Sequence, residues 1–326
     1  MPGRRVVVDS VPVNDELDLL ELRLEHLSPY VDRFVIAESA QTFTGEPKPL
    51  HVTQNLDRFA QYADRMEIVI YAPGRDDSAW DRERLARTTL LQRLQQLEED
   101  SVVLLGDVDE FPSSSQAQAL QTVDGPVVVP LDTFYRRANW RLELDTPFLK
   151  TKAMPVRDLP GDLHALRLDE ELPEVTGERG AHLSFMGFDA AALAAKLLAF
   201  SHTEYQFAAS AAERVLGVSD DMALDHFGRS RARGGGVLTY VAPPDESELH
   251  GWLRSRRPEW FGSRPKAVHV WRAMSAAALD EAMSSHDASK LADLGAWGTV
   301  RSPSARRLLV LRARAALGRI RHGRRH

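Results

Sequence analysis

Three carboxylates follow directly on an apolar run, in the stretch Ser101-Val-Val-Leu-Leu-Gly-Asp-Val-Asp-Glu-Phe-Pro112. Residues 102–106 are apolar or small, which predicts a fully buried strand. On extended backbone, the alternating positions of Asp107 and Asp109 would direct both side chains the same way. Two carboxylates that project together repel each other unless a cation lies between them. Mg²⁺ and Mn²⁺ take oxygen ligands and keep positions open for phosphates, so the stretch predicts a metal–diphosphate site.

A pattern as short as D-x-D also fits a solvated acidic turn, so the surrounding elements must decide between this alternative and the metal site. A helix with Asn14 as its N-cap and Pro29 at its end is predicted, and a second helix covers 81–98. Strands are predicted at 5–9, 33–37, 67–71 and 102–106. This alternation predicts an α/β fold with a doubly wound, mostly parallel sheet, in which ligands bind beyond the carboxyl ends of the strands.

The pattern changes after Pro112, where strands dominate and helices are few. Strands are predicted at 126–130, 133–140, 148–156 and 181–186, a loop region at 157–180 and a helix at 190–200. We therefore expect one domain over 1–230, with a nucleotide-binding half (1–112) and an acceptor-side half of mixed α+β structure (113–230). A C-terminal extension (231–300) packed on this domain and a basic tail (301–326) follow.

Composition limits the classes of function. The 326 residues include no cysteine, which excludes disulfides, thiolate metal sites and a cysteine nucleophile. The net charge is −6, but residues 301–326 hold nine arginines and no acid, which leaves −15 on residues 1–300. An acidic body argues against a nucleic-acid-binding surface. No run approaches the length of a membrane span, and the N-terminus predicts a strand rather than a signal peptide, so we expect a cytoplasmic protein.

The basic tail has its own pattern. Residues 304–320 predict an amphipathic helix with arginines outside its apolar face. Such a helix binds an anionic membrane surface peripherally, or it docks on an acidic protein surface, and the sequence favours neither exclusively.

Several segments, in order, resemble glycosyltransferase family 17. They are Asn14-Asp-Glu-Leu-Asp-Leu-Leu-Glu-Leu-Arg-Leu24, Phe34-Val-Ile-Ala-Glu-Ser39, Thr42-Phe-Thr-Gly-Glu-Pro-Lys-Pro-Leu50, Trp80-Asp-Arg-Glu83, Gly106-Asp-Val-Asp-Glu-Phe-Pro112, Asn139-Trp-Arg-Leu142, His182-Leu-Ser-Phe-Met-Gly187 and Phe200-Ser-His-Thr-Glu204. The resemblance implies a GT-A-type fold, a nucleotide-sugar donor (a UDP-sugar is expected), Mn²⁺ or Mg²⁺, and inversion at the anomeric carbon. Asp107 and Asp109 match its metal and diphosphate motif. Where the family continues with Gln-Arg-Asn, this chain has Ala86-Arg87-Thr88.

For glycosyl transfer from a nucleoside diphosphate, we expect roles for further residues. Arg82 and Arg87 begin the helix before the acidic stretch and would bind the donor phosphates, unless they are simply exposed helix arginines. Glu38 ends the second strand, where it would hold the ribose or base of the donor, or remain a surface carboxylate. His202 would complete the metal shell, with a helix C-terminal dipole partner as its alternative role.

A hydroxyl acceptor needs a general base within hydrogen-bond reach. Asp189 follows a strand and a glycine turn and opens a helix, and Glu204 follows the exit of that helix. Both are candidates, although Asp189 is equally placed for an N-cap.

The primary hypothesis is therefore an inverting, metal-dependent glycosyltransferase. It moves a sugar, N-acetylglucosamine by the resemblance, to a glycan, glycolipid or metabolite hydroxyl. The alternatives are a metal-dependent nucleotidyl or phosphoryl transferase, which a phosphate loop would favour although none occurs, and a non-catalytic nucleotide-sugar- or glycan-binding protein.

Overall fold

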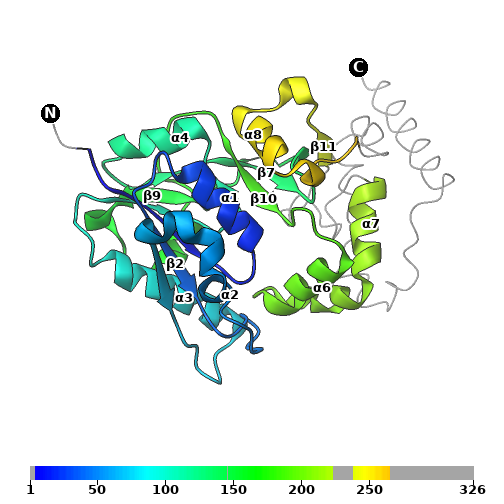
Figure 1. Ribbon diagram of the computed structural model, residues 1–326, viewed down its shortest axis with the longest axis horizontal. Helices are drawn as coiled ribbons and strands as arrows, with labels where there is room; N and C mark the ends of the chain where they lie inside the picture. The colour runs from blue at the N-terminus through cyan, green and yellow to red at the C-terminus, as the bar shows by residue number, and fades with distance from the viewer. Residues whose placement is uncertain (1–3, 145, 223–237, 265–326) are drawn as a thin grey trace, which may run out of the picture. The chain divides into compact units, whose positions relative to one another are not determined.

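The computed structural model describes residues 4–144, 146–222 and 238–264 (Figure 1). The predicted basic tail and much of the predicted 231–300 extension lie outside these ranges. Contacts divide the chain into two units. Unit 1 comprises residues 1–132, 147–183 and 199–201, and unit 2 comprises residues 133–146, 184–198 and 202–326. Within the described ranges, no helix combines the length and apolar character needed to cross a membrane.

Unit 1 is built on a six-stranded sheet in the order β3-β2-β1-β4-β9-β6. The strands are β1 (Val7–Pro12), β2 (Arg33–Glu38), β3 (Met66–Ile70), β4 (Val102–Leu105), β6 (Val127–Val128) and β9 (Lys152–Pro155). The first four strands in this order are parallel, whereas β9 runs antiparallel to both β4 and β6. The predicted α/β fold with a mostly parallel sheet is therefore confirmed.

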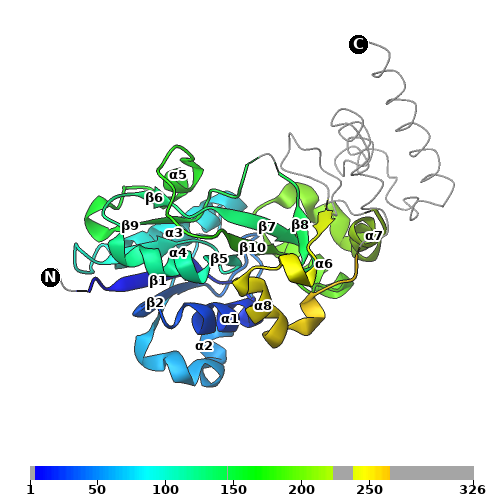
Figure 2. The same cartoon turned by 90° about the horizontal axis from the view of Figure 1, so that it is seen from above.

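Helices cover both faces of this sheet. Unit 1 contains α1 (Leu17–Leu27), α2 (His51–Gln54), α3 (Ala79–Leu94), α4 (Ser114–Ala119) and α5 (Leu163–Leu168), with 3₁₀ helices η1 (Leu56–Arg65), η2 (Leu120–Thr122) and η3 (Val156–Asp158). Figure 2 shows α1 and α2 on one side of the sheet and α3 and α5 on the other. The sheet is therefore doubly wound, as the alternation of strands and helices predicts.

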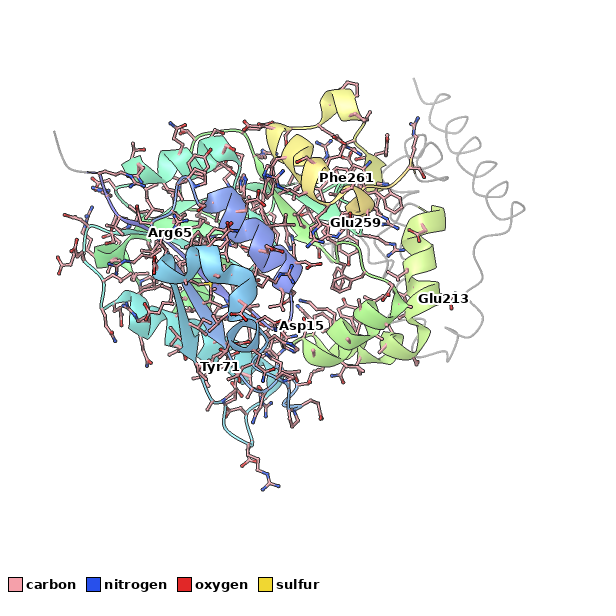
Figure 3. All side chains as sticks on the ribbon, viewed as in Figure 1. Asp15, Arg65, Tyr71, Glu213, Glu259 and Phe261 are labelled. Carbon is pink, nitrogen blue, oxygen red and sulfur yellow. The ribbon has the colours of Figure 1, made fainter. Side chains whose placement is uncertain are left out.

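The α3 face of the sheet is held by a continuous apolar cluster. Leu90 and Leu94 of α3 pack there with Val35, Val103 and other buried residues of the parallel strands. Tyr71, labelled in Figure 3, follows β3 and joins the same cluster. Burial of this apolar surface fixes α3 against the sheet, so the residues in its first half have a defined position at the sheet's carboxyl edge.

Unit 2 contains shorter elements. They are β8 (Trp140–Leu142), β11 (Leu238–Tyr240), α6 (Ala190–Ala199), α7 (Ala212–Met222) and α8 (Glu248–Arg256), with 3₁₀ helices η4 (Thr203–Ala211), η6 (Pro243–Asp245) and η7 (Pro258–Trp260). Strand β8 pairs antiparallel with β11 and with β7 (Leu131–Tyr135). Strands β7 and β10 (Gly180–Ser184) each begin in unit 1 and end in unit 2. In unit 1, β10 pairs antiparallel with β5 (Glu110–Phe111).

The strand predicted at 133–140 is interrupted between β7 and β8, where Arg136 has a positive φ. Two predictions about helices are also wrong. The first is the Asn14 cap, since α1 begins at Leu17 with Glu16 at the N-cap position and no side-chain cap. Instead, the Glu16 carboxylate accepts hydrogen bonds from the backbone N–H groups of Asn14 and Asp15. The second is the loop assigned to 157–180, which contains α5. Asp162 caps this helix by accepting from the N–H groups of its first turn, a local signal that the polar composition of the segment obscured.

Gly180 allows β10 to approach β5 closely. A Cβ atom at this position would lie 2.0 Å from the carbonyl oxygen of Phe111 and 2.8 Å from backbone atoms of Pro112. Because the opposing atoms are backbone, the contact cannot be relieved by a rotamer change. We expect Gly180→Ala to lower the free energy of unfolding by at least about 3 kcal/mol in urea titrations. Gly161→Ala is the control, since nothing lies within 4 Å of its Cβ position. Equal stability of the two variants would contradict the packing described.

Candidate active site

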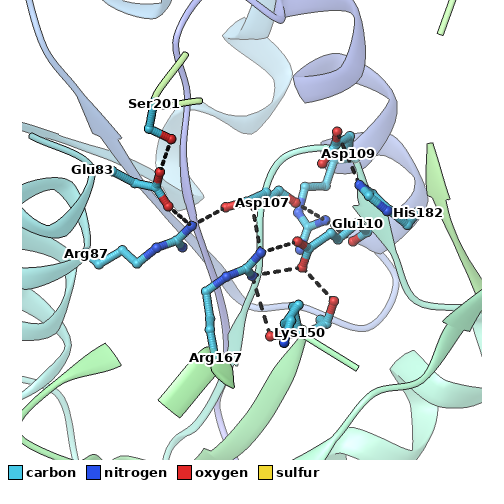
Figure 4. Close-up of polar contacts among 11 residues, drawn as sticks. Glu83, Arg87, Asp107, Asp109, Glu110, Lys150, Arg167, His182 and Ser201 are labelled. Atoms are coloured by element: carbon cyan, nitrogen blue, oxygen red, sulfur yellow. Dashed lines mark hydrogen bonds and ion pairs between the residues drawn. The ribbon is translucent and has the colours of Figure 1, made fainter. Parts of the chain in front are cut away.

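The acidic stretch after β4 forms a turn. The backbone N–H of Glu110 donates to the carbonyl oxygen of Asp107 at 3.0 Å, and Val108 and Asp109 occupy the turn between them. The extended backbone predicted for residues 107–109 is therefore wrong, because the chain reverses here to enter β5. Figure 4 shows the consequence, with Asp107 between two arginines and Asp109 directed toward His182.

Asp107 pairs with arginines from two helices. Its Oδ1 accepts a hydrogen bond from Arg87 of α3 at 2.9 Å, and its Oδ2 accepts one from Arg167 of α5 at 2.8 Å. Burial alone would raise the pKa of the Asp107 carboxyl, but the charges of Arg167 and Arg87 outweigh it and hold that pKa well below its usual range. Asp107 is therefore ionised throughout the physiological pH range.

Arg167 also binds the carboxylate of Glu110, a fully buried residue. Nη2 of Arg167 donates to Oε1 of Glu110 at 2.7 Å, and Nη1 donates to Oε2 at 3.2 Å. Thr151 adds a hydroxyl hydrogen bond of 2.6 Å to Oε2. Burial would lower the pKa of Arg167, but Asp107 and Glu110 raise it. A two-pronged ion pair with a buried carboxylate gives the guanidinium a fixed orientation.

Arg87 connects Asp107 to a second pair of polar groups. It contacts Oε1 of Glu83 at 3.3 Å, one helical turn earlier in α3. The hydroxyl of Ser201 donates to the other oxygen of Glu83. The Nε atom of Arg87 is buried and has no hydrogen-bond partner among the described residues. The Arg87 guanidinium therefore has one unsatisfied donor, at a position closed to solvent.

Asp109 is in a different environment. Its Oδ2 lies 3.7 Å from Nε2 of His182, with both side chains about one-fifth exposed (22% and 17%). The His182 ring stacks on Phe148 with centroids 4.1 Å apart. Burial would lower the pKa of His182, but Asp109, together with the charges of Glu110 and Asp107, raises that pKa. At 3.7 Å the pair is too long for a hydrogen bond, so the Asp109 carboxylate keeps its acceptor capacity.

A fully buried ion pair holds this turn in place. Arg23 of α1 donates to both carboxylate oxygens of Asp9 in β1, at 2.6 and 2.7 Å. Its Nη1 also donates to the backbone carbonyls of Asp107 and Glu110. Both side chains are at most 2% exposed. Arg23 therefore ties the acidic turn to the first strand and the first helix.

Glu38 and Arg82, predicted to bind the donor, make well-defined contacts within unit 1. Glu38 is fully buried and accepts hydrogen bonds from the N–H groups of Val52 and Thr53 in α2. Arg82 donates to the backbone carbonyls of residues 74 and 75, and its guanidinium lies against Gly45, where a Cβ would be 2.9 Å from Nη2. Both side chains thus position loops beyond the ends of β2 and β3, and their donor-binding roles stay predictions.

The predicted general bases and third metal ligand lie in unit 2. Asp189 is exposed and accepts a hydrogen bond from the N–H of Ala192 at 2.8 Å, so it caps α6. His202 is exposed and precedes η4, and Glu204 lies within that helix. Because the relative position of the two units is not defined, the structure does not bring these residues together with Asp107 and Asp109. Their roles also stay predictions.

Arg167 and Thr151 are the residues of this site that sequence reasoning missed. Arg167 falls in the segment predicted as a loop, and Thr151 falls in a predicted strand without a recognised role. The Asp162 cap and the i, i+3 spacing of Leu163 and Leu166 were the available signals for α5. No local signal shows that α5 reaches the acidic turn, since sixty residues separate Arg167 from Asp107.

The donor atoms at the turn fit a hard divalent cation in type. Asp107 and Asp109 supply carboxylate oxygens, and each Asp107 oxygen keeps a second lone pair besides the one that accepts from an arginine. No three His, Asp or Glu side chains converge as a metal cluster in the described part of the chain. Two carboxylates suit Mg²⁺ or Mn²⁺, which usually complete their shells with water and substrate phosphate oxygens.

Lys152 provides a test of the electrostatics around this site. It lies in β9 with no exposed surface, and its ammonium donates to the carbonyl of Leu149. Burial, together with the nearby charges of Lys150 and Arg167, lowers the pKa of Lys152 to about 8. The folded state therefore releases this proton at lower pH than the unfolded state, so stability rises with pH from about 8 toward the ordinary lysine pKa of about 10.4.

We expect the free energy of unfolding of the wild type, relative to that of Lys152→Met, to rise by about 1–2 kcal/mol between pH 7.5 and 9.5. Urea titrations at the two pH values measure this difference. Lys196→Met in α6 is the matched control, since Lys196 is not among the charges that shift the pKa of Lys152. A pH-independent difference for Lys152→Met would contradict a lowered pKa.

Comparisons with known proteins agree with the resemblance seen in the sequence. Residues 1–213 match the model of glycosyltransferase family 17. The human β-1,4-mannosyl-glycoprotein 4-β-N-acetylglucosaminyltransferase is 33% identical over 130 residues, and the rat protein of that name 32%. Each match covers 37% of this chain and only 24% of the relative, so the similarity spans about a quarter of those proteins.

A solved structure was also found, the mannosyltransferase PcManGT from Pyrobaculum calidifontis in complex with GDP-Man and Mn²⁺. It is 15% identical, with a TM-score of 0.36, and the match covers 97% of this chain and 87% of that one. The match of residues 1–213, about two-thirds of the sequence, places this protein in a family. The chain belongs to glycosyltransferase family 17.

Proposed function

We propose that the protein is a GT-A-type, inverting, cation-dependent glycosyltransferase that transfers a sugar from a nucleoside-diphosphate donor to a hydroxyl of a glycan, glycolipid or metabolite. The observation that carries the proposal is the charged turn after β4 in a chain of glycosyltransferase family 17. Asp107 lies there beside arginines from α3 and α5, and Asp109 faces His182 two residues later, at the carboxyl edge of a doubly wound sheet. Ligands bind at this edge in such sheets.

Departure of a diphosphate requires its negative charge to be stabilised. Asp107 and Asp109 would hold Mn²⁺ or Mg²⁺, which would supply Lewis-acid neutralisation of that charge. Arg87, held by Asp107 and Glu83, adds a fixed positive charge beside the diphosphate. Glu38 and Arg82 set the loops beyond β2 and β3, against which we place the nucleoside. His202 remains our candidate for a further cation ligand.

Activation of the acceptor hydroxyl needs a base on the face opposite the leaving group, if the reaction inverts the anomeric carbon. We assign this role to Asp189, with Glu204 as the second candidate. Asp189 uses one carboxylate oxygen, Oδ1, to cap α6, which leaves Oδ2 to accept a proton. The donor sugar is proposed as N-acetylglucosamine from the names of the human and rat relatives.

Product analysis tests this function. The protein is incubated with Mn²⁺ and UDP-N-acetylglucosamine, UDP-glucose, UDP-galactose or GDP-mannose, and the nucleotide products are separated by anion-exchange chromatography. A glycosyltransferase is expected to release a nucleoside diphosphate and free sugar slowly even without an acceptor. Release of a nucleoside monophosphate would instead indicate cleavage of the diphosphate, as in a phosphoryl or nucleotidyl transferase. Absence of nucleoside diphosphate release with every donor would contradict the proposal.

A further inference from the structure

We propose that Arg167 is a donor-positioning residue, which pairs with Asp107 in the free protein and with the donor diphosphate once a cation occupies Asp107. This role rests on the proposed function, since it assumes a cation and a diphosphate at the turn after β4. It adds a residue from α5, outside the half of the chain expected to bind the nucleotide.

Arg167 makes more contacts than a structural counterion requires. Its two-pronged pair with Glu110 already satisfies that buried carboxylate, which also accepts from Thr151. Yet Nη2 of Arg167 makes a further hydrogen bond to Asp107 at 2.8 Å. The Asp107 side chain is 36% exposed and also pairs with Arg87, so it keeps a counterion when Arg167 leaves. The contact with Asp107 is therefore the part of the network that can be exchanged.

Cation and arginine compete for the same carboxylate. Arg87 and Arg167 occupy different oxygens of Asp107, so a divalent ion arriving there meets two positive charges within hydrogen-bond distance of its ligand. Like charges at such separations repel strongly where the surroundings are partly buried. Movement of one guanidinium away from Asp107 lowers this repulsion. Thermodynamic linkage requires that cation binding weakens the pairing of arginine with Asp107 by the same factor by which this pairing weakens cation binding.

Arg167 is better suited than Arg87 to make the exchange. Arg167 stays attached to fully buried Glu110 through two hydrogen bonds, so leaving Asp107 does not release it from the site. Its freed N–H group then needs an anionic acceptor beside the cation. A diphosphate provides such oxygens, and the planar fork of arginine matches phosphate geometry. The same residue therefore opposes the bare cation and favours the cation together with the donor.

Arg167 is expected to weaken the binding of Mn²⁺ alone and to strengthen the binding of the diphosphate with Mn²⁺. These opposite effects make the test specific. Mn²⁺ alone is titrated into the full chain and followed by electron paramagnetic resonance, and UDP is titrated in saturating Mn²⁺ by calorimetry. For Arg167→Gln we expect Mn²⁺ alone to bind roughly five- to tenfold more tightly, and UDP with Mn²⁺ to bind at least about tenfold more weakly. The double variant Glu110→Gln/Arg167→Met leaves no buried unpaired carboxylate, and it is expected to show the same two shifts if the single variant does not fold.

Arg157→Gln controls for the loss of one positive charge, because Arg157 pairs with Asp100 and Asp124 at the amino end of β4. It should change neither affinity. If Arg167 is only the counterion of Glu110, both affinities of the variants fall together or stay unchanged, and the proposal is overturned. Wild-type protein that binds no nucleoside diphosphate in Mn²⁺ would instead overturn the proposed function, and this role with it.

Discussion

Asp109→Asn is expected to abolish cation-dependent binding of nucleoside diphosphates while leaving the fold intact. Asp109 offers a carboxylate whose nearest partner, His182, is 3.7 Å away, so the amide removes a cation ligand without breaking a hydrogen bond. Loss of a group that only supports a metal ligand typically weakens binding 10- to 100-fold, so loss of a ligand itself should weaken it by about 100-fold or more. Calorimetric titration of UDP in Mn²⁺ measures the change.

The stability of Asp109→Asn shows whether the loss of nucleotide binding comes from the site alone or from unfolding of the protein. We expect the free energy of unfolding of Asp109→Asn to stay within about 1 kcal/mol of the wild type, because the long, partly exposed contact with His182 contributes little. Asp100→Asn is the matched control, since Asp100 is 80% exposed and precedes the amino end of the same strand. Unchanged UDP affinity in Asp109→Asn would remove this carboxylate from the binding site.

Arg23→Met is expected to produce the largest loss of stability, about 3–5 kcal/mol, because it leaves Asp9 buried and without its charged partner. The substitution also removes the hydrogen bonds to the carbonyls of Asp107 and Glu110, so the acidic turn loses its attachment to α1. Urea unfolding of the variant measures the change. Adding Asp9→Asn should recover part of the loss, since the double variant buries no unpaired charge.

Arg58→Met is the control for this prediction. Arg58 is likewise an ion-paired arginine, but its partners, Asp18 and Glu21 of α1, are at the surface. Its removal should cost less than about 1 kcal/mol. Equal losses for the two arginines would show that the buried pair with Asp9 does not dominate the stability of this region.

Hydrophobic periodicity predicts the parallel half of the fold. The apolar runs that become β1 to β4 and the spaced leucines of α1 and α3 carry a local signal, and the order of strands and helices then predicts a doubly wound sheet. The position of the candidate site beyond β4 follows from this topology. The resemblance to glycosyltransferase family 17, seen in ordered short segments, is confirmed over residues 1–213.

Long-range contacts could not be predicted in this way. The sequence places Arg23 among the polar positions of an amphipathic helix, yet it is fully buried because Asp9 lies opposite it in β1. Extended backbone through Asp107 and Asp109 was the natural prediction after an apolar strand. The turn forms instead because residues 110–111 pair with β10, some seventy residues later in the chain. Contacts between residues so far apart have no periodic signal in the sequence.

The central claim is that the turn after β4 binds a cation together with a diphosphate. Calorimetric titration of UDP and GDP into the wild-type chain, in Mn²⁺ and in EDTA, tests it most directly. Our account predicts saturable binding of at least one of the two nucleotides in Mn²⁺, and none in EDTA at the same concentrations. Equal affinity with and without the ion, or no binding of either nucleotide in Mn²⁺, would contradict it.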